Sequence, residues 1–238
     1  MTQKLFWEDQ YLKQFTASIV NNDGNNLILD KTAFYPTGGG QPCDTGIISF
    51  KGKEYKVVSV SKKGNDIVHA LEEHIPAEIN DSVEGTIDWD KRYSHMRLHT
   101  ALHTLDGVME KIYRIGKITG NQIYDERARI DLDIDGATRE KMAELVEATN
   151  KVLAEGHEVV ARIISREEAL ANPELVRAET GLAIIKSVPE VRTIEIVGLD
   201  IQTDGGTHVK NTKEVGKMVL SNYLSKGTHN KRIEIILE

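Results

Sequence analysis

The sequence predicts an α+β protein, in which a small β-barrel-like domain is followed by an α/β two-layer domain with an antiparallel sheet. Two observations predict this class. Residues 1–88 contain short segments rich in Val, Ile and aromatic residues, separated by turn residues. Near Asp88 the apolar pattern changes to a helical period, and helical and alternating segments follow one another from there. We therefore expect one domain at residues 1–88 and a second at residues 89–238.

The β pattern of the first domain is interrupted by two segments that are typical of hairpin turns. They are Lys51-Gly52-Lys53 and Lys62-Lys63-Gly64-Asn65-Asp66. Short strands at this spacing favour a small barrel or a folded sheet. The predicted strands are Ile47–Phe50, Tyr55–Val60, Ile67–Ala70 and Val83–Ile87.

The second domain is predicted to begin with a long helix. Asp88 or Asp90 can cap it, its apolar residues keep helical spacing to about Tyr113, and Gly116 is expected to end it. Further on, the sequence predicts a half-buried strand, an amphipathic helix, a short helix that begins with a capping box, and four more strands. In that order, the elements are Ala128–Ile134, Thr138–Glu155, the helix after Ser165 with Glu168, Val159–Ile164, Val191–Val197, Lys217–Leu224 and Arg232–Leu237.

Composition limits the function. The chain of 238 residues is 39% hydrophobic and 28% charged, which is typical of a globular protein. No apolar run approaches the ~18 residues that a membrane span needs, and no signal peptide is recognisable, so we expect no membrane partner. The single cysteine, Cys43, excludes an internal disulfide and a cysteine-rich zinc cluster, and it fits a cytoplasmic protein.

The net charge of −7 argues against a protein that binds long nucleic acids, so we expect no DNA partner. Contact with a few terminal nucleotides would need only a local basic patch. The oligomeric state stays open.

Two pairs of potential metal ligands share the same spacing. His99 and His103 lie one turn apart on one face of the predicted helix, so both imidazoles can reach one ion. Asp204 and His208 flank Gly205-Gly206, and these glycines would let the backbone turn tightly. Together the pairs supply the four ligands of a tetrahedral zinc site.

Both pairs also have simpler explanations. A helical histidine pair arises often by chance, and Asp-Gly-Gly is a common turn. His95 extends the helical series by one turn. The outer two of the three histidines are further apart around the helix than neighbours are, so we expect His95 to be an ordinary packed or solvated residue.

A glycine run in Thr32–Pro42 is the third feature. Gly38, Gly39 and Gly40 follow an aromatic pair and permit unusual backbone angles and the close approach of a ligand. This is not a phosphate-binding loop, because the lysine and Ser/Thr that should follow are missing. A plain surface turn is the alternative.

These three features occur in the same order in a known family. The chain resembles the free-standing alanyl-tRNA editing proteins, which are relatives of the editing domain of alanyl-tRNA synthetase. The segment from Phe34 to Gly46 is similar to the family's glycine-rich motif, His99–His103 to its first zinc motif, and Gly205–Val209 to its second. The glycine-rich N-terminal domain matches the medium-length members. The family's second motif usually begins with cysteine, whereas this chain has Asp204.

The resemblance implies a zinc-dependent deacylase that hydrolyses the ester of mischarged Ser-tRNA(Ala), and of Gly-tRNA(Ala), at the acceptor end of alanine tRNA. It implies Zn²⁺ held by His99, His103 and His208. Asp204 is either the fourth ligand or binds weakly and leaves three histidines plus solvent. Thr32, which matches a threonine of the glycine-rich motif, is the candidate catalytic residue that reads serine's hydroxyl; alternatively, it only ends a strand. Gly38, Gly39, Gly40 and Lys210 are the candidate substrate-binding residues.

Sequence does not decide whether the zinc would activate a water, polarise the ester carbonyl or hold the substrate. A non-catalytic RNA-binding module with a structural zinc is the main alternative function, and the aspartate in place of cysteine motivates it. A metallohydrolase with another substrate is a third possibility. Peptidase activity is disfavoured, because Thr100 occupies the position after the first histidine where the common zinc-protease motif has glutamate.

Overall fold

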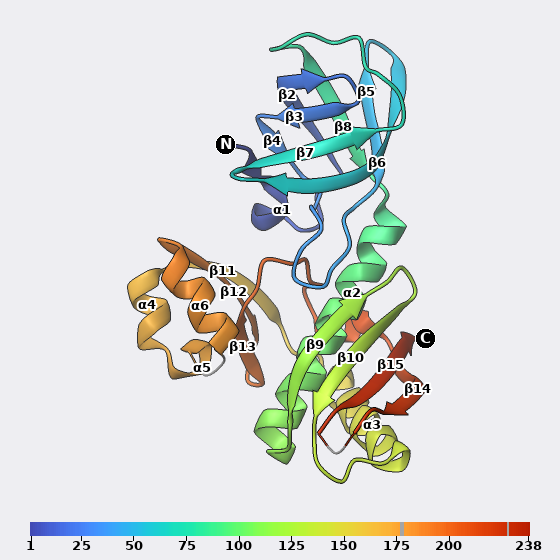
Figure 1. The fold of residues 1–238 in the computed structure, drawn as a ribbon, viewed down its shortest axis with the longest axis vertical. Coiled ribbons are helices and arrows are strands. Elements are labelled where there is room, and N and C mark those ends of the chain that lie inside the picture. Colours follow the sequence, from blue (N-terminus) through green and yellow to red (C-terminus); the bar gives the residue numbers. More distant parts are fainter. Residues whose placement is uncertain (177–178, 228) are drawn as a thin grey trace. The chain divides into compact units, whose positions relative to one another are not determined.

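A computed structural model describes residues 1–176, 179–227 and 229–238. The chain divides into two compact units, residues 1–95 and 96–238 (Figure 1). The division falls inside helix α2 (Trp89–Gly107), later than the boundary predicted at residue 88. The first turns of this helix belong to the first unit, because the Arg92 side chain bonds to Asp44 and to the carbonyl of Ala33.

The first unit is a closed barrel in which every neighbouring pair of strands is antiparallel. The predicted barrel is therefore confirmed. Its strands, in their order around the barrel, are β2 (Gln14–Asp23), β3 (Asn26–Leu29), β7 (Asp66–Leu71), β6 (Lys53–Lys63), β5 (Gly46–Phe50) and β8 (Ser82–Ile87).

All four predicted strands of this unit are present, in β5, β6, β7 and β8. The predicted turns are confirmed too: Lys51 and Gly52 have φ angles of 49° and 80°, and Gly64 has 63°. Positive φ at both central residues, as at Lys51 and Gly52, or at the first alone, as at Gly64, gives a mirror-image turn that matches the twist of a hairpin. Strands β2 and β3 were not predicted individually, because β2 ends in the polar run Asn21-Asn22-Asp23, which resembles a loop.

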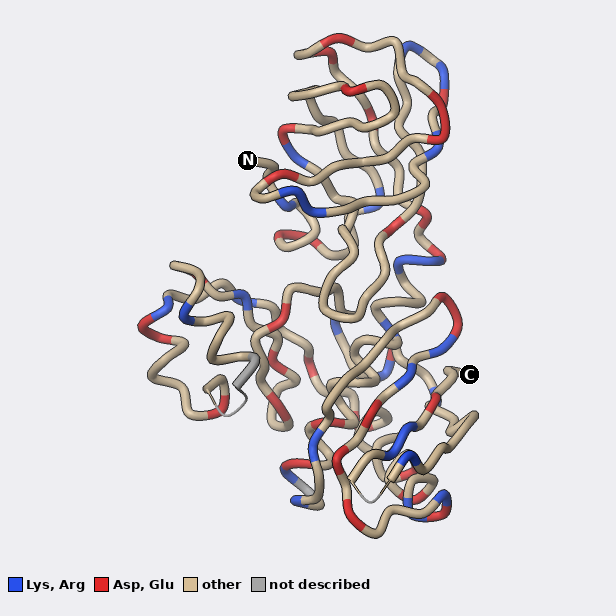
Figure 2. Tube along the Cα trace, viewed as in Figure 1, with Lys and Arg blue, Asp and Glu red and all other residues tan. Residues whose placement is uncertain are grey.

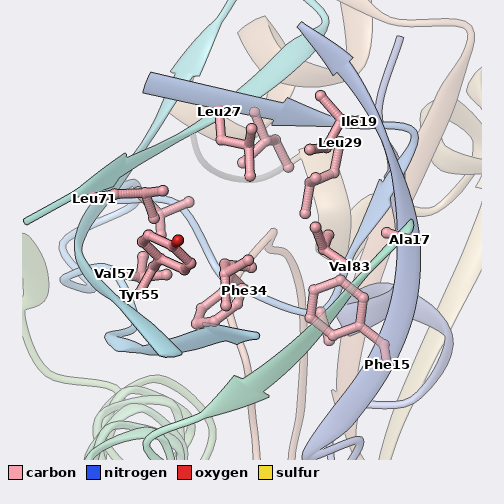
Figure 3. Close-up of a cluster of buried hydrophobic side chains, with 14 of the residues drawn as sticks. Phe15, Ala17, Ile19, Leu27, Leu29, Phe34, Tyr55, Val57, Leu71 and Val83 are labelled. Carbon is pink, nitrogen blue, oxygen red and sulfur yellow. The ribbon is translucent and has the colours of Figure 1, made fainter. Parts of the chain in front are cut away.

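Apolar side chains from opposite walls fill the barrel, as Figure 3 shows. Phe34 lies among them although it belongs to no strand, and it is fully buried. Its ring meets that of Phe15 edge to face, with centroids 5.8 Å apart. The glycine-rich segment is therefore anchored in the barrel core by its first aromatic residue.

Three short elements complete the first unit. Strand β1 (Gln3–Lys4) pairs in parallel with β4 (Lys31–Thr32), and helix α1 (Leu5–Glu8) follows β1 directly. Two-residue strands carry no periodic signal, so the sequence could not predict β1 and β4.

The larger sheet of the second unit is antiparallel, with the order β14-β15-β10-β9. Alternate residues of β10 are fully buried, as predicted. Helix α3 (Arg139–Glu155) packs along β14, and the side chain of Asn150 bonds to both the N–H and the carbonyl of Met218. The strands are β9 (Lys117–Ile123), β10 (Arg127–Asp133), β14 (Met218–Ser225) and β15 (Lys231–Leu237).

Helix α3 has the boundaries and the apolar stripe that the sequence predicted. The Thr138 hydroxyl accepts the N–H of Lys141 as the cap, and Gly156 ends the helix with a φ of 86°. The predicted stripe residues Met142, Leu145, Val146, Thr149, Val152 and Leu153 are the buried ones.

Strands β11 (Val159–Ser165), β12 (Glu190–Ile196) and β13 (Asp200–Thr203) form a separate antiparallel sheet. The α+β class with antiparallel sheets is confirmed, but the second unit has two such sheets where one was expected. The smaller sheet has an apolar cluster of its own, formed with its helices by Ala169, Leu175, Ile185 and Val191. These helices are α4 (Arg166–Ala171), which begins with the predicted Ser165–Glu168 capping box, α5 (Pro173–Val176) and α6 (Glu179–Ser187).

Helix α2 begins and ends near the expected residues. The Asp88 carboxylate accepts the N–H of Lys91 at 3.4 Å, so Asp88 rather than Asp90 is the cap. After Gly107 the helix continues as the π-helix η1 (Val108–Tyr113), which ends at Arg114 with a φ of 53°. Arg114 therefore terminates the helix before Gly116.

Charged residues of both signs are interspersed along each unit (Figure 2), in keeping with the modest net charge of −7. None of the helices in the described parts of the chain has the length and apolar character of a membrane span.

Candidate functional site

Two segments of the second unit bring four potential metal ligands together. Helix α2 carries His99 and His103, and the loop after β13 carries Asp204 and His208. One ligand atom from each residue lies within 4.8 Å of those from the other three. The two pairs singled out in the sequence therefore converge on one point. We call these four residues the metal cluster.

The cluster is tightly packed and almost closed to solvent. The ring of His208 lies 4.3 Å from that of His99 and 4.7 Å from that of His103, between centroids. Asp204 approaches two of the rings: its Oδ2 atom is 3.0 Å from His208 Nε2, and its Oδ1 atom is 3.7 Å from His99 Nε2. The three histidines are at most 8% exposed. Electrostatic interactions in such a place are stronger than at the surface.

Burial and the nearby charges set the protonation states of Asp204 and His208. Burial would raise the pKa of Asp204, but the charge of His99 and the hydrogen bond from His208 outweigh it and hold the pKa well below its usual range. Burial lowers the pKa of His208 well below its usual value, and a positive charge on His99 lowers it further. A carboxylate beside neutral imidazole is the state in which both side chains can bind a cation.

These residues fit a metal ion. Three imidazoles and one carboxylate make a four-ligand set of nitrogen and oxygen donors, which suits zinc and similar divalent metals. The Nδ1 atom of His103 is buried and has no hydrogen-bond partner among the described residues. Since an unsatisfied buried polar atom is costly, this nitrogen is one more group for which a bound ion or water would compensate.

Strand β12 holds the loop that carries Asp204. The Asp204 N–H donates to the Arg192 carbonyl at 3.1 Å, and Arg192 Nη1 donates to the Asp204 carbonyl at 2.9 Å. The turn itself differs from the expectation: neither Gly205 nor Gly206 has a positive φ angle. Instead, the Gly206 N–H donates to Asp204 Oδ2 at 2.7 Å, so the carboxylate organises the turn that follows it.

Thr100, between the two helical histidines, holds His208 from the other side. Its Oγ1 atom lies 3.1 Å from His208 Nδ1 and accepts the N–H of Val209 at 3.2 Å. The Nε2 atom of His208 is then the one that faces Asp204. Such partners of the second ring nitrogen fix the orientation of a ligating histidine. From the sequence, Thr100 was noted only as the residue in place of the protease glutamate, and its contact with His208 was not predicted, although its place inside the helical motif was visible.

The glycine run belongs to the first unit, and two of its glycines have a clear structural reason. Gly38 and Gln41 exchange two backbone hydrogen bonds of 3.1 and 3.0 Å, which closes a tight hairpin. Gly39 and Gly40, between them, have φ angles of 60° and 80°. Both positions favour glycine for its freedom at positive φ. The role of Gly38, Gly39 and Gly40 in substrate binding stays a prediction.

Thr32 is the last residue of β4 and is fully buried. Its hydroxyl oxygen lies 2.8 Å from His69 Nε2 and accepts the N–H of Phe34 at 3.1 Å. Thr32 therefore does end a strand, as the alternative interpretation expected. Its role with the substrate stays a prediction. His69, 37 residues away along the chain, was not singled out, because only the closed barrel brings it to Thr32.

A buried ion pair between Arg92 and Asp44 fixes the glycine-rich segment near both of its ends, at Ala33 and at Asp44. Arg92 Nε donates to Asp44 Oδ1 at 2.9 Å, its Nη2 bonds to the other carboxylate oxygen, and Nη2 also donates to the Ala33 carbonyl at 2.6 Å. The Tyr35 N–H donates to Asp44 at 2.5 Å. Both side chains of the pair are fully buried. The sequence did not predict this pair, because nothing in the local pattern distinguishes Arg92 from a surface arginine.

The remaining candidates lie outside the metal cluster. His95 is fully buried and is not part of it, as expected of a packed helical histidine. The Lys210 residue is exposed, and its N–H donates to Glu214. Its contact with a phosphate stays a prediction.

The fold and the site define the class of protein. It is an α+β chain with a closed antiparallel barrel, further antiparallel sheets and a buried site of nitrogen and oxygen donors that can hold a metal ion.

Two family models match parts of the chain. "tRNA synthetases class II (A)" matches residues 6–91, and "Threonyl and Alanyl tRNA synthetase second additional domain" matches residues 191–234. The second range contains Asp204 and His208.

Whole-chain similarity is more specific. The chain is 39% identical to the alanyl-tRNA editing protein AlaX-M of Saccharolobus solfataricus, over 98% of each chain. It is 40% identical to the AlaX-M protein of Methanosarcina mazei, over 98% of this chain and 95% of that one. The alanine–tRNA ligase of Ignicoccus hospitalis is 39% identical over 91% of this chain, which corresponds to 24% of the ligase. The chain therefore belongs to the AlaX-M family of alanyl-tRNA editing proteins, as the resemblance in the sequence indicated.

Proposed function

We propose that this protein is a trans-editing hydrolase that cleaves the ester bond of Ser-tRNA(Ala), and also of Gly-tRNA(Ala), at a zinc site formed by the metal cluster. One observation carries the proposal: four ligand atoms lie within 4.8 Å of one another in a chain of the alanyl-tRNA editing family. Such an enzyme answers a general need. A pocket that is built for alanine cannot exclude glycine and rejects an added hydroxyl poorly, so a second site must remove the errors.

In the proposed mechanism His99, His103 and His208 hold the ion as neutral imidazoles, and Asp204 supplies a negative charge. A zinc ion there would supply Lewis acidity, with which a water or the ester carbonyl is activated. Arg192 keeps the Asp204 segment in place in two ways: its backbone carbonyl accepts the Asp204 N–H, and its side chain donates to the Asp204 carbonyl. Burial of the histidines strengthens the attraction between the ligands and a cation.

Serine must be distinguished from alanine by its hydroxyl, and we assign that task to Thr32. A site that hydrogen-bonds a substrate hydroxyl discriminates strongly against the analogue that lacks it. Gly38, Gly39 and Gly40 are assigned to the substrate through their backbone, and Lys210 to a phosphate of the acceptor end. Contacts with unpaired nucleotides rely on stacking and on the backbone, which agrees with a net charge of −7.

The test is a deacylation assay with purified protein, using Ser-tRNA(Ala) and Ala-tRNA(Ala), with and without a chelator. We expect hydrolysis of the serine ester in large excess over the alanine ester, lost with the chelator and restored by zinc. Hydrolysis of neither ester, or of both equally, contradicts the proposal. If chelation unfolds the protein and the zinc-loaded form binds tRNA without deacylating it, the zinc is structural and the alternative of an RNA-binding module is correct.

The contact between Thr100 and His208 gives a prediction about metal affinity. Replacing Thr100 with valine removes the partner of His208 Nδ1, so we expect zinc to bind about 10–100-fold more weakly. A competition titration with a chromogenic chelator measures this. Thr104→Val is the matched control, since Thr104 is equally buried on the same helix but its hydroxyl donates to the Thr100 carbonyl. Equal zinc affinities of the two variants would show that Thr100 does not orient His208.

A further inference from the structure

Thr32 has a partner that the metal site does not use. Strand β7 brings His69 to the end of β4, where its Nε2 atom lies 2.8 Å from the Thr32 hydroxyl oxygen. Both side chains are fully buried. The Phe34 and His69 rings meet edge to face at an interplanar angle of 73°, with centroids 5.6 Å apart, so the imidazole is held by packing as well.

The position of the hydrogen on His69 follows from its other neighbour. The Nδ1 atom lies 3.1 Å from the carbonyl oxygen of Leu27, and because a carbonyl only accepts, Nδ1 must carry the hydrogen. Burial lowers the pKa of His69 to about 4, against a smaller opposing effect of the Leu27 bond, so the ring is neutral near pH 7. A neutral ring with hydrogen on Nδ1 has a bare Nε2, which can only accept.

The Thr32 hydroxyl must therefore donate its hydrogen to His69. Its oxygen already accepts the N–H of Phe34 at 3.1 Å, and a hydroxyl oxygen has two acceptor positions. The Thr32 oxygen therefore has one acceptor position left, whereas its hydrogen is already donated to His69. A further group can bind this oxygen only by giving it a hydrogen. Serine's hydroxyl has such a hydrogen, and alanine's methyl group has none.

We infer that His69 is a positioning residue that fixes the Thr32 hydroxyl as an acceptor and so sets the preference for serine over alanine. This inference rests on the proposed function, in which Thr32 reads the serine hydroxyl. His69 acts through Thr32 and needs no contact with the substrate itself.

Two substitutions separate the two hydrogen bonds of the ring. The amide oxygen of His69→Gln can occupy the position of Nε2 and accept from Thr32. The amide nitrogen of His69→Asn can occupy that of Nδ1 and donate to Leu27, but leaves Thr32 without an acceptor. The test compares kcat/KM for Ser-tRNA(Ala) and Ala-tRNA(Ala) in the zinc-loaded chain of 238 residues. We expect His69→Asn to lower the serine-to-alanine ratio by about tenfold, the size of one hydrogen bond, and His69→Gln to retain the ratio.

The control is His74→Asn, at an exposed histidine of the same unit, which should leave the ratio unchanged. If the wild type prefers serine but the ratio is the same in the His69→Asn variant and the wild type, the inference is wrong while the proposed function stands. If both His69 variants lose the ratio equally, the residue is only structural and the inference is again wrong. If the wild type does not prefer serine, the proposed function itself fails.

A second measurement does not depend on whether the variants fold. Spectra of wild-type protein with ¹⁵N-labelled histidine report which ring nitrogen carries hydrogen, and His69→Gln assigns the signal. Should that variant not fold, the signal is assigned from through-bond connections within the wild type. We expect a neutral ring with hydrogen on Nδ1 at pH 7. Hydrogen on Nε2 would make His69 the donor and overturn the inference.

Discussion

Replacing His103 with alanine is expected to lower zinc affinity and the rate of Ser-tRNA(Ala) hydrolysis together, each by more than about 100-fold. Removing a residue that only hydrogen-bonds to a metal ligand already costs about 10–100-fold in metal affinity or activity. His103 belongs to the metal cluster itself, so its removal should cost more. The substitution also removes a ring that lies 5.0 Å from His99 and 4.7 Å from His208, between centroids. Zinc content by elemental analysis and single-turnover deacylation measure the two effects.

The matched control is His229→Ala, which removes an exposed histidine from the same unit. It should leave zinc content and rate unchanged. If His103→Ala keeps its zinc but loses activity, His103 acts on the substrate and not as a ligand. If it loses its zinc and keeps full activity, the metal is not catalytic. Either result contradicts the proposed site.

Replacing Arg92 with methionine is expected to lower the free energy of unfolding of the first unit by about 3–5 kcal/mol, because it leaves the buried Asp44 carboxylate without its counter-ion. The loss includes the hydrogen bond from Arg92 to the Ala33 carbonyl. Both tryptophans, Trp7 and Trp89, lie in this unit, so their fluorescence during urea unfolding reports on it.

The double variant Arg92→Met with Asp44→Asn should recover part of the loss, since no unpaired charge remains buried and the amide oxygen can still accept the Tyr35 N–H. Lys53→Met is the control. Lys53 lies in the same unit, and its pair with Glu73 is at the surface, so its removal should leave the free energy of unfolding nearly unchanged. A loss at Arg92 no larger than that at Lys53 would show that the buried pair does not hold the glycine-rich segment.

The elements that the sequence predicted well are those with a strong local period. Helix α3 has its cap, its stripe and its terminating glycine within one segment, and β10 alternates buried and charged residues without interruption. The missed elements lack such a signal. Strand β13 has four residues, and β9 contains Gly120 and few apolar residues. These strands form because a neighbouring strand offers hydrogen bonds, which no local pattern records.

The same distinction explains the candidate site. Each half of the metal cluster is a local pair four residues apart, so both halves were visible in the sequence and only their convergence needed the structure. The contacts of Thr32 with His69 and of Asp44 with Arg92 join residues 37 and 48 positions apart. They depend on the strand order of the barrel and on the start of α2. Residue types alone therefore could not indicate them.

The two units differ in their exposure to unwanted self-association. In the barrel each strand from β2 to β8 that forms the wall has a partner on both sides, so the wall presents no free row of backbone donors to another chain. The sheets of the second unit end in open strands, such as β11, which carries the exposed Arg162, and β9, which begins with Lys117. Charged residues on open strands discourage edge-to-edge pairing but leave the backbone donors and acceptors of the edge unpaired. Because these open strands are still a better template for another chain than a closed wall, we expect aggregation at high concentration or on heating to begin in the second unit.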